Sequence, residues 1–435
     1  MNKDIATAAL EMALKAGASD ARISLFEGKE SSIEMTDAQV ENLKESFSSS
    51  LNISIFTEGK FGAFYTNRLE KEDLRSFIDN CIKATRLIAP DPFRKLPESS
   101  LYFNGVEPDF HLYDPCFEEY SFGKKLDLLK SSCSEIDFKD SRIITVASSY
   151  DDSLRREYTI SSNNLEVFEQ RTIFAISNEF TLRDKGDSKP QNGWNDGAAF
   201  IDEIPSGITS CGFERSIAML GARKISSGRY NVVFENTVSS KAIGAILSAL
   251  QGSSIVLKSS FLENSIGKQV FPKEMTLTDR PHVVGNINSS CFDSEGVATR
   301  EFDIISEGVV NSFLLNTYYA GKLYMPRTIS NPVNPYLKPN CDFGKDKIIR
   351  QMDKGILITA FNGGNTNPVT GDFSFGCEGF YFQAGEIQYP VKEMNISGNF
   401  ISLWRNLCFI GNDPLGFMRR SIPTLAFNDV DISGL

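Results

Sequence analysis

The first half of the chain alternates between helical and strand-like patterns of apolar residues. Ile5, Ala8 and Met12 recur at helical spacing, which predicts an amphipathic helix. Apolar and polar residues alternate on both sides of the turn at 58–60, which predicts a β-hairpin. The predicted elements of this half are helix 4–16, hairpin 51–65, helix 71–88, an irregular linker 90–120, helix 121–133, strands across 142–183 with a turn at Asn163-Asn164, a polar loop 184–197 and helix 208–222.

The second half begins with a strand and a strongly apolar helix. Residues 230–234 read as the strand, and residues 236–251 as a helix closed by Gly252. Its apolar side chains recur every four residues, which indicates that one face is buried in a core. The stripe consists of Val238, Ala242, Ile246 and Leu250. From residue 280 onward, short alternating segments and Gly, Pro or Asn turns follow one another, which favours an antiparallel sheet or barrel.

These patterns predict an α+β fold, and the 435 residues suffice for more than one domain. We expect an N-terminal α+β domain over 1–224, with antiparallel strands and helices and sub-parts at about 1–90 and 110–224. We expect a C-terminal domain over 225–435 that is mainly antiparallel β, sheet-like or barrel-like, and contains a buried helix.

The net charge and the cysteine pattern limit which partners and which cellular compartment are expected. The net charge is −11, and the basic pairs Arg155-Arg156 and Arg419-Arg420 are isolated, so no direct nucleic-acid contact is expected. The eight cysteines form no C-x-x-C pair, which is typical of buried thiols in a reducing compartment. Glu11 and Lys15 interrupt the first apolar stretch, so it reads as a helix rather than a signal peptide. We therefore expect a cytoplasmic protein without a membrane segment.

The histidine content limits the available chemistry. The chain has only two histidines, His111 in the linker and His282 before an expected apolar strand. Zinc hydrolases usually take two or three histidine ligands, and a serine or cysteine nucleophile usually needs a histidine base. Neither histidine has a companion at ligand spacing. We expect one surface and one structural histidine, and assign no catalytic, cofactor-binding or metal residue to this chain.

Three other motifs are candidate sites. Gly363-Gly364, within Asn362–Asn367, reads as a turn rather than a phosphate cradle, and Asp429–Gly434 resembles a calcium loop but lacks its final glutamate. Acidic residues cluster in 293–303 and would suit acid–base chemistry, although acids in turns are common. This cluster consists of Asp293, Glu295, Glu301 and Asp303.

The second half resembles the TldD/PmbA family, the so-called modulators of DNA gyrase, and within it the PmbA (TldE) branch. The first half fits more loosely. The matching stretches are Gly221-Ala-Arg-Lys224, Gly228-Arg-Tyr-Asn-Val-Val-Phe-Glu235, Lys258-Ser-Ser-Phe261, Ser265-Ile-Gly-Lys-Gln269, Phe292-Asp-Ser-Glu-Gly-Val297, Gly371-Asp-Phe-Ser374, Gly379-Phe-Tyr-Phe382, Gly385-Glu-Ile-Gln-Tyr-Pro-Val391, Trp404-Arg-Asn406 and Gly411-Asn-Asp413.

The resemblance implies a role in a peptidase complex. In the TldD branch, a helix after the strand matching 230–234 carries H-E-x-x-x-H, which supplies the base and zinc ligands, and a cysteine near the C-terminus completes the site. Here the corresponding helix, Ala242–Gly252, has no His, Glu or Cys, and no Cys follows Cys408. The resemblance therefore implies a subunit without its own zinc, which pairs with a TldD-like peptidase subunit that holds the metal and hydrolyses peptides.

Three functional hypotheses remain open at this point. The first is the non-catalytic subunit of a TldD-type metallopeptidase complex. The second is an independent metallopeptidase with carboxylate and cysteine ligands, and the third is a peptide-binding or regulatory protein linked to DNA gyrase modulation. We expect a dimer formed through the C-terminal half, a homodimer in isolation. We also expect strands around 371–391 to accept a peptide by edge pairing.

Overall fold

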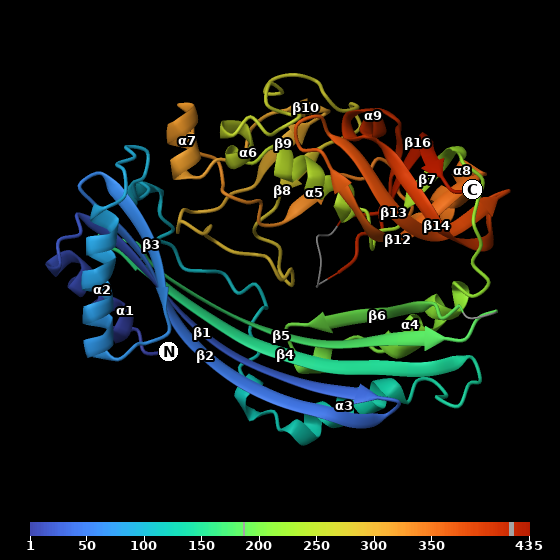
Figure 1. Ribbon diagram of the computed structural model, residues 1–435, viewed down its shortest axis with the longest axis horizontal. Coiled ribbons are helices and arrows are strands. Elements are labelled where there is room, and N and C mark those ends of the chain that lie inside the picture. The colour runs from blue at the N-terminus through green and yellow to red at the C-terminus, as the bar shows by residue number, and fades with distance from the viewer. Residues whose placement is uncertain (186–187, 417–421) are drawn as a thin grey trace.

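The structure is a computed structural model that describes residues 1–185, 188–416 and 422–435. The Arg419-Arg420 pair lies outside the described residues, as do Gly186 and Asp187 of the predicted polar loop. Figure 1 shows a curved sheet from the first half of the chain, with the second half seated against its concave side. The fold is α+β with antiparallel sheets, as predicted.

The first half is built around one six-stranded antiparallel sheet in the order β3-β2-β1-β4-β5-β6. Its convex face carries the helices (Figure 1). The strands are β1 (Asp20–Thr36), β2 (Gln39–Thr57), β3 (Lys60–Thr66), β4 (Ile143–Ser161), β5 (Glu166–Leu182) and β6 (Gln191–Ala198). The helices are α1 (Asp4–Lys15), α2 (Lys71–Arg86), α3 (Phe122–Cys133) and α4 (Ile208–Ala218), with short 3₁₀ turns η1 (Ser99–Leu101), η2 (Phe117–Glu119) and η3 (Ile201–Glu203).

Buried apolar residues recur at every second position along β1, which shows which residues lie on each face of the sheet. Ile23 and Leu25 are buried in a cluster with α1 and α2, and Ile33 and Met35 are buried in a second cluster with α3. Successive side chains of a strand point to opposite faces. The residues between these apolar positions therefore face the concave side, where the second half of the chain lies.

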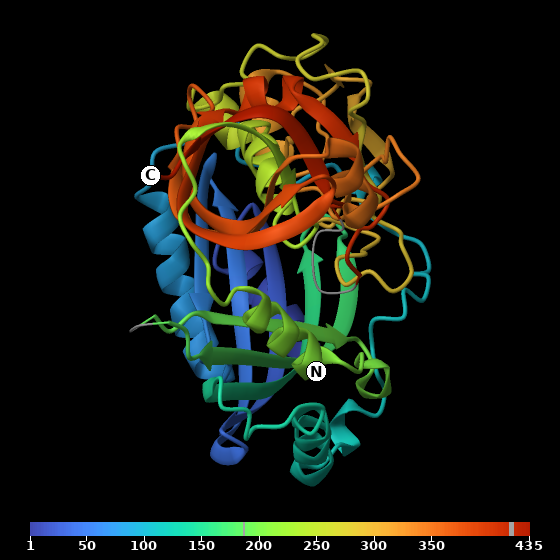
Figure 2. The same cartoon turned by 90° about the vertical axis from the view of Figure 1, so that its right-hand side faces the viewer.

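The second half contains a closed barrel-like sheet and a smaller sheet. The larger sheet runs β14-β13-β12-β7-β16-β15, and a β14–β16 pairing closes it into the ring seen end-on in Figure 2. Its strands are β7 (Gly228–Phe234), β12 (Gly355–Thr366), β13 (Asp372–Gln383), β14 (Glu386–Asn399), β15 (Leu407–Ile410) and β16 (Leu425–Ser433). The smaller sheet, β10-β9-β8-β11, consists of β8 (Leu277–Asp279), β9 (Phe302–Ser306), β10 (Val309–Val310) and β11 (Pro335–Leu337).

Helices cover both faces of the barrel-like sheet. Val232 and Phe234 of β7 are buried in the main core with α5, whereas Val233 points to the opposite face and packs with α8. The predicted buried helix is confirmed, since Ile246 and Leu250 are fully buried. The helices of this half are α5 (Ser240–Ala249), α6 (Gly252–Val256), α7 (Thr317–Leu323), α8 (Lys345–Met352) and α9 (Phe400–Arg405).

Several local predictions were wrong. Most of strand β6 lies inside the predicted polar loop 184–197, and Gly252 begins α6 as well as following α5. Helices α7 and α8 interrupt the region where only short strands were expected. The prediction of a mainly antiparallel domain is confirmed, because β7 and β12 pair in parallel and the other described pairings of the barrel-like sheet are antiparallel.

The composition of β6 explains why it reads as a loop. It is the edge strand of the sheet and contains polar residues and glycines. A Cβ at Gly193 would lie 1.9 Å from the carbonyl oxygen of Asn178 on β5, so the close approach of the strands requires glycine there. The backbone N–H of Gly193 donates to the side chain of Asn192 at 2.8 Å. The polar residues and glycines of β6 suit the edge of a sheet. They leave no alternation of apolar and polar residues from which the strand could be predicted.

Two further findings concern the environment of the chain. All eight cysteines are free thiols. Within the described residues, no helix is long and apolar enough to cross a membrane.

Candidate functional site: a cleft on the concave face

The concave face of the N-terminal sheet and the barrel-like sheet enclose a large polar cleft. Its volume is about 1060 Å³. Four acidic side chains line it, together with Arg215 of α4 and the aromatic rings of Trp194 and Phe361. The acidic residues are Glu34, Glu41, Asp151 and Glu179. A second cavity of about 380 Å³ continues along the same sheet face and shares Asp151 and Ala175 with the first.

The barrel-like sheet contributes strand β12 to this cleft. Thr359, Ala360 and Phe361 line the cavity. On one side β12 pairs with β13 along most of its length, whereas its pairing with β7 covers only Ile356–Ile358. Residues 362–370 are exposed. Among the described pairings, β12 has no partner on the β7 side from Thr359 onward, and the first residues of this open edge, Thr359–Phe361, line the cleft.

The strands predicted to accept a peptide are not the ones with an open edge. Strand β13 pairs with β12 on one side and β14 on the other, so the expectation for its part of 371–391 is wrong. The outer side of β14 is partly occupied, because the N–H of Arg223 donates to the carbonyl of Pro390 and the carbonyl of Arg223 accepts from the N–H of Lys392. The first half of the predicted region is thus an internal strand.

Helix α5 borders a separate pocket of about 420 Å³. The face of α5 that lines it carries Lys241, Gly244, Ala245, Ser248 and Ala249. The Lys241 ammonium lies 4.6 Å from the centre of the Phe375 ring. None of these five residues is a usual zinc ligand.

The part of the chain that the structure describes does not bring together residues that fit a zinc ion. Within residues 1–185, 188–416 and 422–435, no group of three or more His, Cys, Asp or Glu side chains has the geometry to hold a metal. The α5 pocket, where the resemblance places the metal of a TldD-type subunit, lacks imidazole, carboxylate and thiol groups on its helical wall. We therefore derive no metal-dependent step for this chain.

The two histidines have separate local partners. His111 Nε2 lies 2.8 Å from Glu203 Oε1, and its ring stacks on Phe200 with centroids 4.0 Å apart. His282 Nε2 lies 2.9 Å from Thr299 Oγ1. His282 is exposed and is followed by an irregular loop rather than the apolar strand expected from the sequence. The Nε2 atoms of the two histidines thus contact different side chains.

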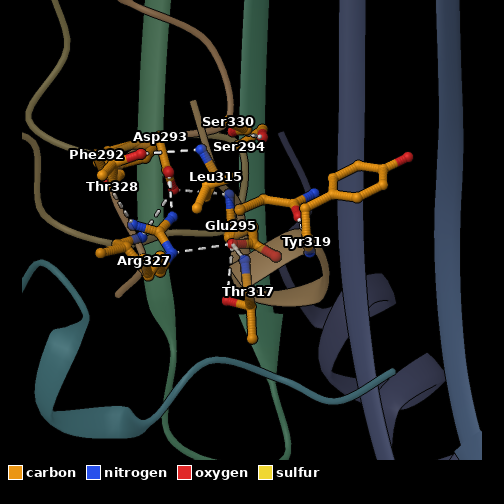
Figure 3. A network of polar contacts seen from close by, with 12 residues as sticks. Phe292, Asp293, Ser294, Glu295, Leu315, Thr317, Tyr319, Arg327, Thr328 and Ser330 are labelled. Atoms are coloured by element: carbon orange, nitrogen blue, oxygen red, sulfur yellow. Dashed lines mark hydrogen bonds and ion pairs between the residues drawn. The ribbon is translucent and has the colours of Figure 1, made fainter. Parts of the chain in front are cut away.

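The acidic cluster predicted at 293–303 separates into two parts. Asp293 and Glu295 converge on Arg327, as Figure 3 shows, with Glu295 Oε2 3.1 Å from Arg327 Nε. Glu301 lies 3.9 Å from Arg280 Nε on another surface, and Asp303 accepts a hydrogen bond from Thr278 at 2.6 Å. Sequence proximity therefore did not produce a four-carboxylate site.

The Arg327 network is satisfied internally. Asp293 also accepts the N–H groups of Glu295 and Val297, and Glu295 accepts both the N–H and the hydroxyl of Thr317. Burial raises the pKa of Asp293, and the charge of Arg327 opposes this shift. With hydrogen bonds and a cation at both carboxylates, the arrangement stabilises the loop rather than presenting an acid–base pair.

The other two motifs have structural roles. The pairing of β12 with β13 is irregular between Phe361 and Gly364, the next paired residue, which has a φ of 122°, so the predicted turn is part of a bulged strand. The calcium-like segment at 429–434 lies largely in β16, where Asp429 pairs with Arg229 at 3.0 Å.

Comparisons with known proteins match this architecture in both halves. Residues 227–434 match the PmbA/TldA metallopeptidase C-terminal domain, and residues 21–85 match PmbA/TldA metallopeptidase domain 1. A crystal structure of a so-called modulator of DNA gyrase from Bacteroides thetaiotaomicron superimposes with a TM-score of 0.96 at 37% identity, covering 100% of this chain and 99% of that one. The chain belongs to the PmbA/TldD family.

Relatives in this family carry peptidase names. Metalloprotease PmbA of Escherichia coli O157:H7 is 28% identical over 415 residues, which cover 94% of this chain and 91% of that protein. TldE from Thermococcus kodakarensis shares the fold, with a TM-score of 0.78 at 17% identity over 98% of this chain and 99% of that one. The family resemblance inferred from the second half of the sequence is thus confirmed across nearly the whole chain.

Sequence reasoning missed two groups of charged residues that the fold assembles. Glu235 contacts Arg215 and Lys345, which come from α4 and α8. Glu157 lies directly opposite Glu169 on neighbouring strands. The strand patterns over 142–183 were visible in the sequence, but only the register between β4 and β5 shows which charges face each other.

Proposed function

We propose that this chain is the PmbA/TldE-type subunit of a two-component metallopeptidase, and that it shapes the peptide cleft while a TldD-type partner holds zinc and hydrolyses the peptide. The observation that carries this proposal is the composition of α5. The helix is kept as a packing element, with Ile243 and Ile246 fully buried, and its pocket-facing side offers Lys241, Gly244, Ala245 and Ser248 instead of ligands.

The cleft supports the peptide-binding part of the proposal. A volume of about 1060 Å³ lies at the upper end of ordinary ligand pockets, at about 300–1,000 Å³, and suits an extended peptide. The open edge of β12 offers backbone groups that pair with any sequence, as in β-strand addition. The four carboxylates of the lining would attract cationic side chains of the peptide.

A second candidate, a protein that only binds peptides, is supported by the same cleft. It differs from the first in needing no partner for its role. The eight free thiols fit a reducing compartment, so we place either activity in the cytoplasm. A connection with DNA gyrase, as in the names of some relatives, would then be indirect.

The deciding experiment measures peptidase activity of this chain, of a TldD-type protein from the same genome, and of their mixture, each with added zinc. Sedimentation of the same samples reports assembly. We expect activity and a heterodimer only in the mixture. A chain that stays monomeric and adds no activity would exclude the subunit proposal and leave the binding protein. Zinc-dependent cleavage by this chain alone would instead establish an independent metallopeptidase.

A cleft variant tests where the peptide binds. Glu179 lies in the cleft and is exposed, so Glu179→Lys should fold normally and raise the KM for lysine-containing peptides severalfold without changing assembly. Glu11→Lys, on the exposed side of α1, is the matched control. Equal KM values for the two variants would place the peptide elsewhere.

A further inference from the structure

The pocket beside α5 combines apolar walls with a single charge. Its volume of about 420 Å³ lies within the usual range of ligand pockets, about 300–1,000 Å³. Among the described residues of its lining, Lys241 is the only charged one. Three residues with hydroxyl groups also line it, and the others are glycine or apolar residues. The apolar residues are Ala245, Ala249, Phe261, Pro368, Phe375 and Phe400.

The aromatic wall of this pocket is held by packing within the protein. Phe375 and Phe400 are buried. Both rings pack on Phe373, with centroids 5.4 Å and 4.6 Å away. The ring of Phe261 stacks on Phe400 at a centroid distance of 6.2 Å. The wall is therefore formed in the absence of a ligand and offers a preorganised surface to an aliphatic or aromatic group.

Lys241 places a positive charge beside this apolar wall. Its ammonium lies 4.6 Å from the centre of the Phe375 ring. Within the described residues, no carboxylate forms an ion pair with Lys241, whereas the ammonium of Lys345 contacts Glu235 at 2.8 Å. A single cation next to an apolar cavity suits a ligand with one negative charge and an apolar body, such as a carboxylic acid with a hydrophobic side chain.

Strand β12 connects this pocket with the large acidic cleft. Residues Thr359–Phe361 line the cleft, and Thr366 of the same strand lines the α5 pocket. From Thr359 onward, β12 has no described partner on its β7 side. A peptide that pairs with this open edge would therefore pass from the cleft to the pocket.

The charges of the two cavities favour one direction for such a peptide. The cleft is lined by four carboxylates and by Arg215, which is paired with Glu235. The α5 pocket has the ammonium of Lys241 as its one described charge. Electrostatic attraction therefore draws the amino end of the peptide toward the cleft and its carboxylate toward Lys241. In this direction the peptide runs parallel to β12, as β7 does in its own pairing with that strand.

We propose that the α5 pocket binds the C-terminal residue of a peptide, with its carboxylate on Lys241 and an apolar side chain against the aromatic wall. The inference rests on the proposed function for the peptide nature of the ligand. It adds which end of the peptide is recognised, the direction of the chain and the class of its last side chain. Binding of this kind requires neither zinc nor a partner subunit.

Calorimetric titration of the full chain alone measures this binding. The probe is pentaalanyl-phenylalanine with a free carboxylate. Its C-terminal amide lacks the negative charge, phenylalanyl-pentaalanine carries the ring at the other end, and 3-phenylpropionate is a free acid without a peptide. We expect saturable binding of the probe and at least about tenfold weaker binding of the other three, since each lacks the charge, the apolar contact or the strand pairing.

Two variants of the pocket locate the binding. Lys241→Gln removes the cation, and Ser248→Phe fills the pocket from an exposed position of α5. Each should weaken binding of the probe about tenfold without changing the melting temperature. The matched controls are Lys83→Gln on α2 and Ser131→Phe on α3, both exposed, which should leave binding unchanged.

The proposal would be overturned by absence of saturable binding, by equal affinity for the amide, the isomer or 3-phenylpropionate, or by unchanged affinity in both pocket variants. Its outcome can be separated from that of the subunit proposal. A chain that binds the probe as expected but adds no activity to a TldD-type protein would refute the subunit proposal alone. A chain that adds activity but binds the acid and the amide equally would refute this inference alone.

Discussion

Replacement of Glu235 by glutamine should measure how strongly the two halves of the chain are joined. Glu235 follows β7 and is only 3% exposed at its side chain. Its carboxylate lies 2.8 Å from Arg215 Nη2, contributed by α4 of the first half, and 2.8 Å from Lys345 Nζ, at the start of α8. Thr237 donates a further hydrogen bond at 2.7 Å. The variant removes the anion and leaves two cations facing a neutral amide.

The magnitude follows from the pKa of Glu235. Burial by itself would raise this pKa, but the hydrogen bonds and charges of Arg215 and Lys345 outweigh burial and lower it from 4.5 to about 2. A difference of about 2.5 pH units between the unfolded and folded states corresponds to about 3 kcal/mol of stability at neutral pH. Breaking buried ion pairs by removal of one partner costs a similar amount, about 3–5 kcal/mol.

The dependence on pH identifies the source of this stability. Because the folded pKa is lowered, the contribution of Glu235 is complete above its unfolded value of 4.5 and is lost as the pH falls toward 2. Urea unfolding of the wild type and of Glu235→Gln should therefore differ by about 3 kcal/mol at pH 7, and by roughly half of that or less at pH 3. Trp194, whose ring lies 5.1 Å from the Arg215 guanidinium, provides a fluorescence signal at this contact.

The control is Glu214→Gln, which changes the neighbouring exposed carboxylate of α4 and should alter stability by less than about 0.5 kcal/mol. Equal stability of wild type and Glu235→Gln at pH 7 would refute the reasoning. A difference that stays the same from pH 7 to pH 3 would show that packing, rather than charge, accounts for the effect.

Three further variants test other parts of the structure. Ile246→Asp should misfold, because an unpaired charge in the core of α5 costs several kcal/mol; native far-UV circular dichroism and wild-type stability would contradict the packing described. Arg327→Gln should lower stability by about 3 kcal/mol in thermal unfolding, because Asp293 and Glu295 lose their shared cation; an unchanged melting temperature would show that solvent replaces it. Glu157→Gln should stabilise the chain by about 1–2 kcal/mol at pH 8, since its pKa is raised from 4.5 to about 7 on folding, so ionisation opposes folding above pH 4.5 and does so fully above pH 7. This gain should vanish below about pH 4.5 in denaturant titrations, and a constant gain would point to a cause other than ionisation.

The sequence predicted those helices and strands in which regularly spaced apolar residues form one face of the element. Helices 4–16, 71–88 and 121–133 appear as α1, α2 and α3, within a few residues at each end. The hairpin at 51–65 appears as the β2–β3 pair, although β2 begins twelve residues earlier, at Gln39. A segment with one apolar face must bury that face whatever covers it, so its pattern is readable from the segment alone. Strand β6 was not predicted, because an edge strand with glycines and polar side chains has no apolar face to bury.

The candidate site depended on pairings between distant residues. Arg327 reaches the two carboxylates of the 293–303 cluster from outside that cluster, and Glu235 receives Lys345 from 110 positions away in the chain. Such contacts leave no local signal in a single sequence, because each partner by itself reads as an ordinary surface charge. For the same reason, the open edge of β12 could not be distinguished from the internal strand β13.

The sequence by itself determined the α+β class, the apolar helix after strand 230–234 and the scarcity of histidine, since composition and periodicity are properties of the chain before it folds. Only the tertiary structure decided that the concave face of one sheet would oppose a closed barrel-like sheet, and that Glu157 would face Glu169. The register of β4 against β5 sets that second contact. A shift of β4 by one residue would move Glu157 to the other face, away from Glu169, and the register is fixed by packing along the whole sheet.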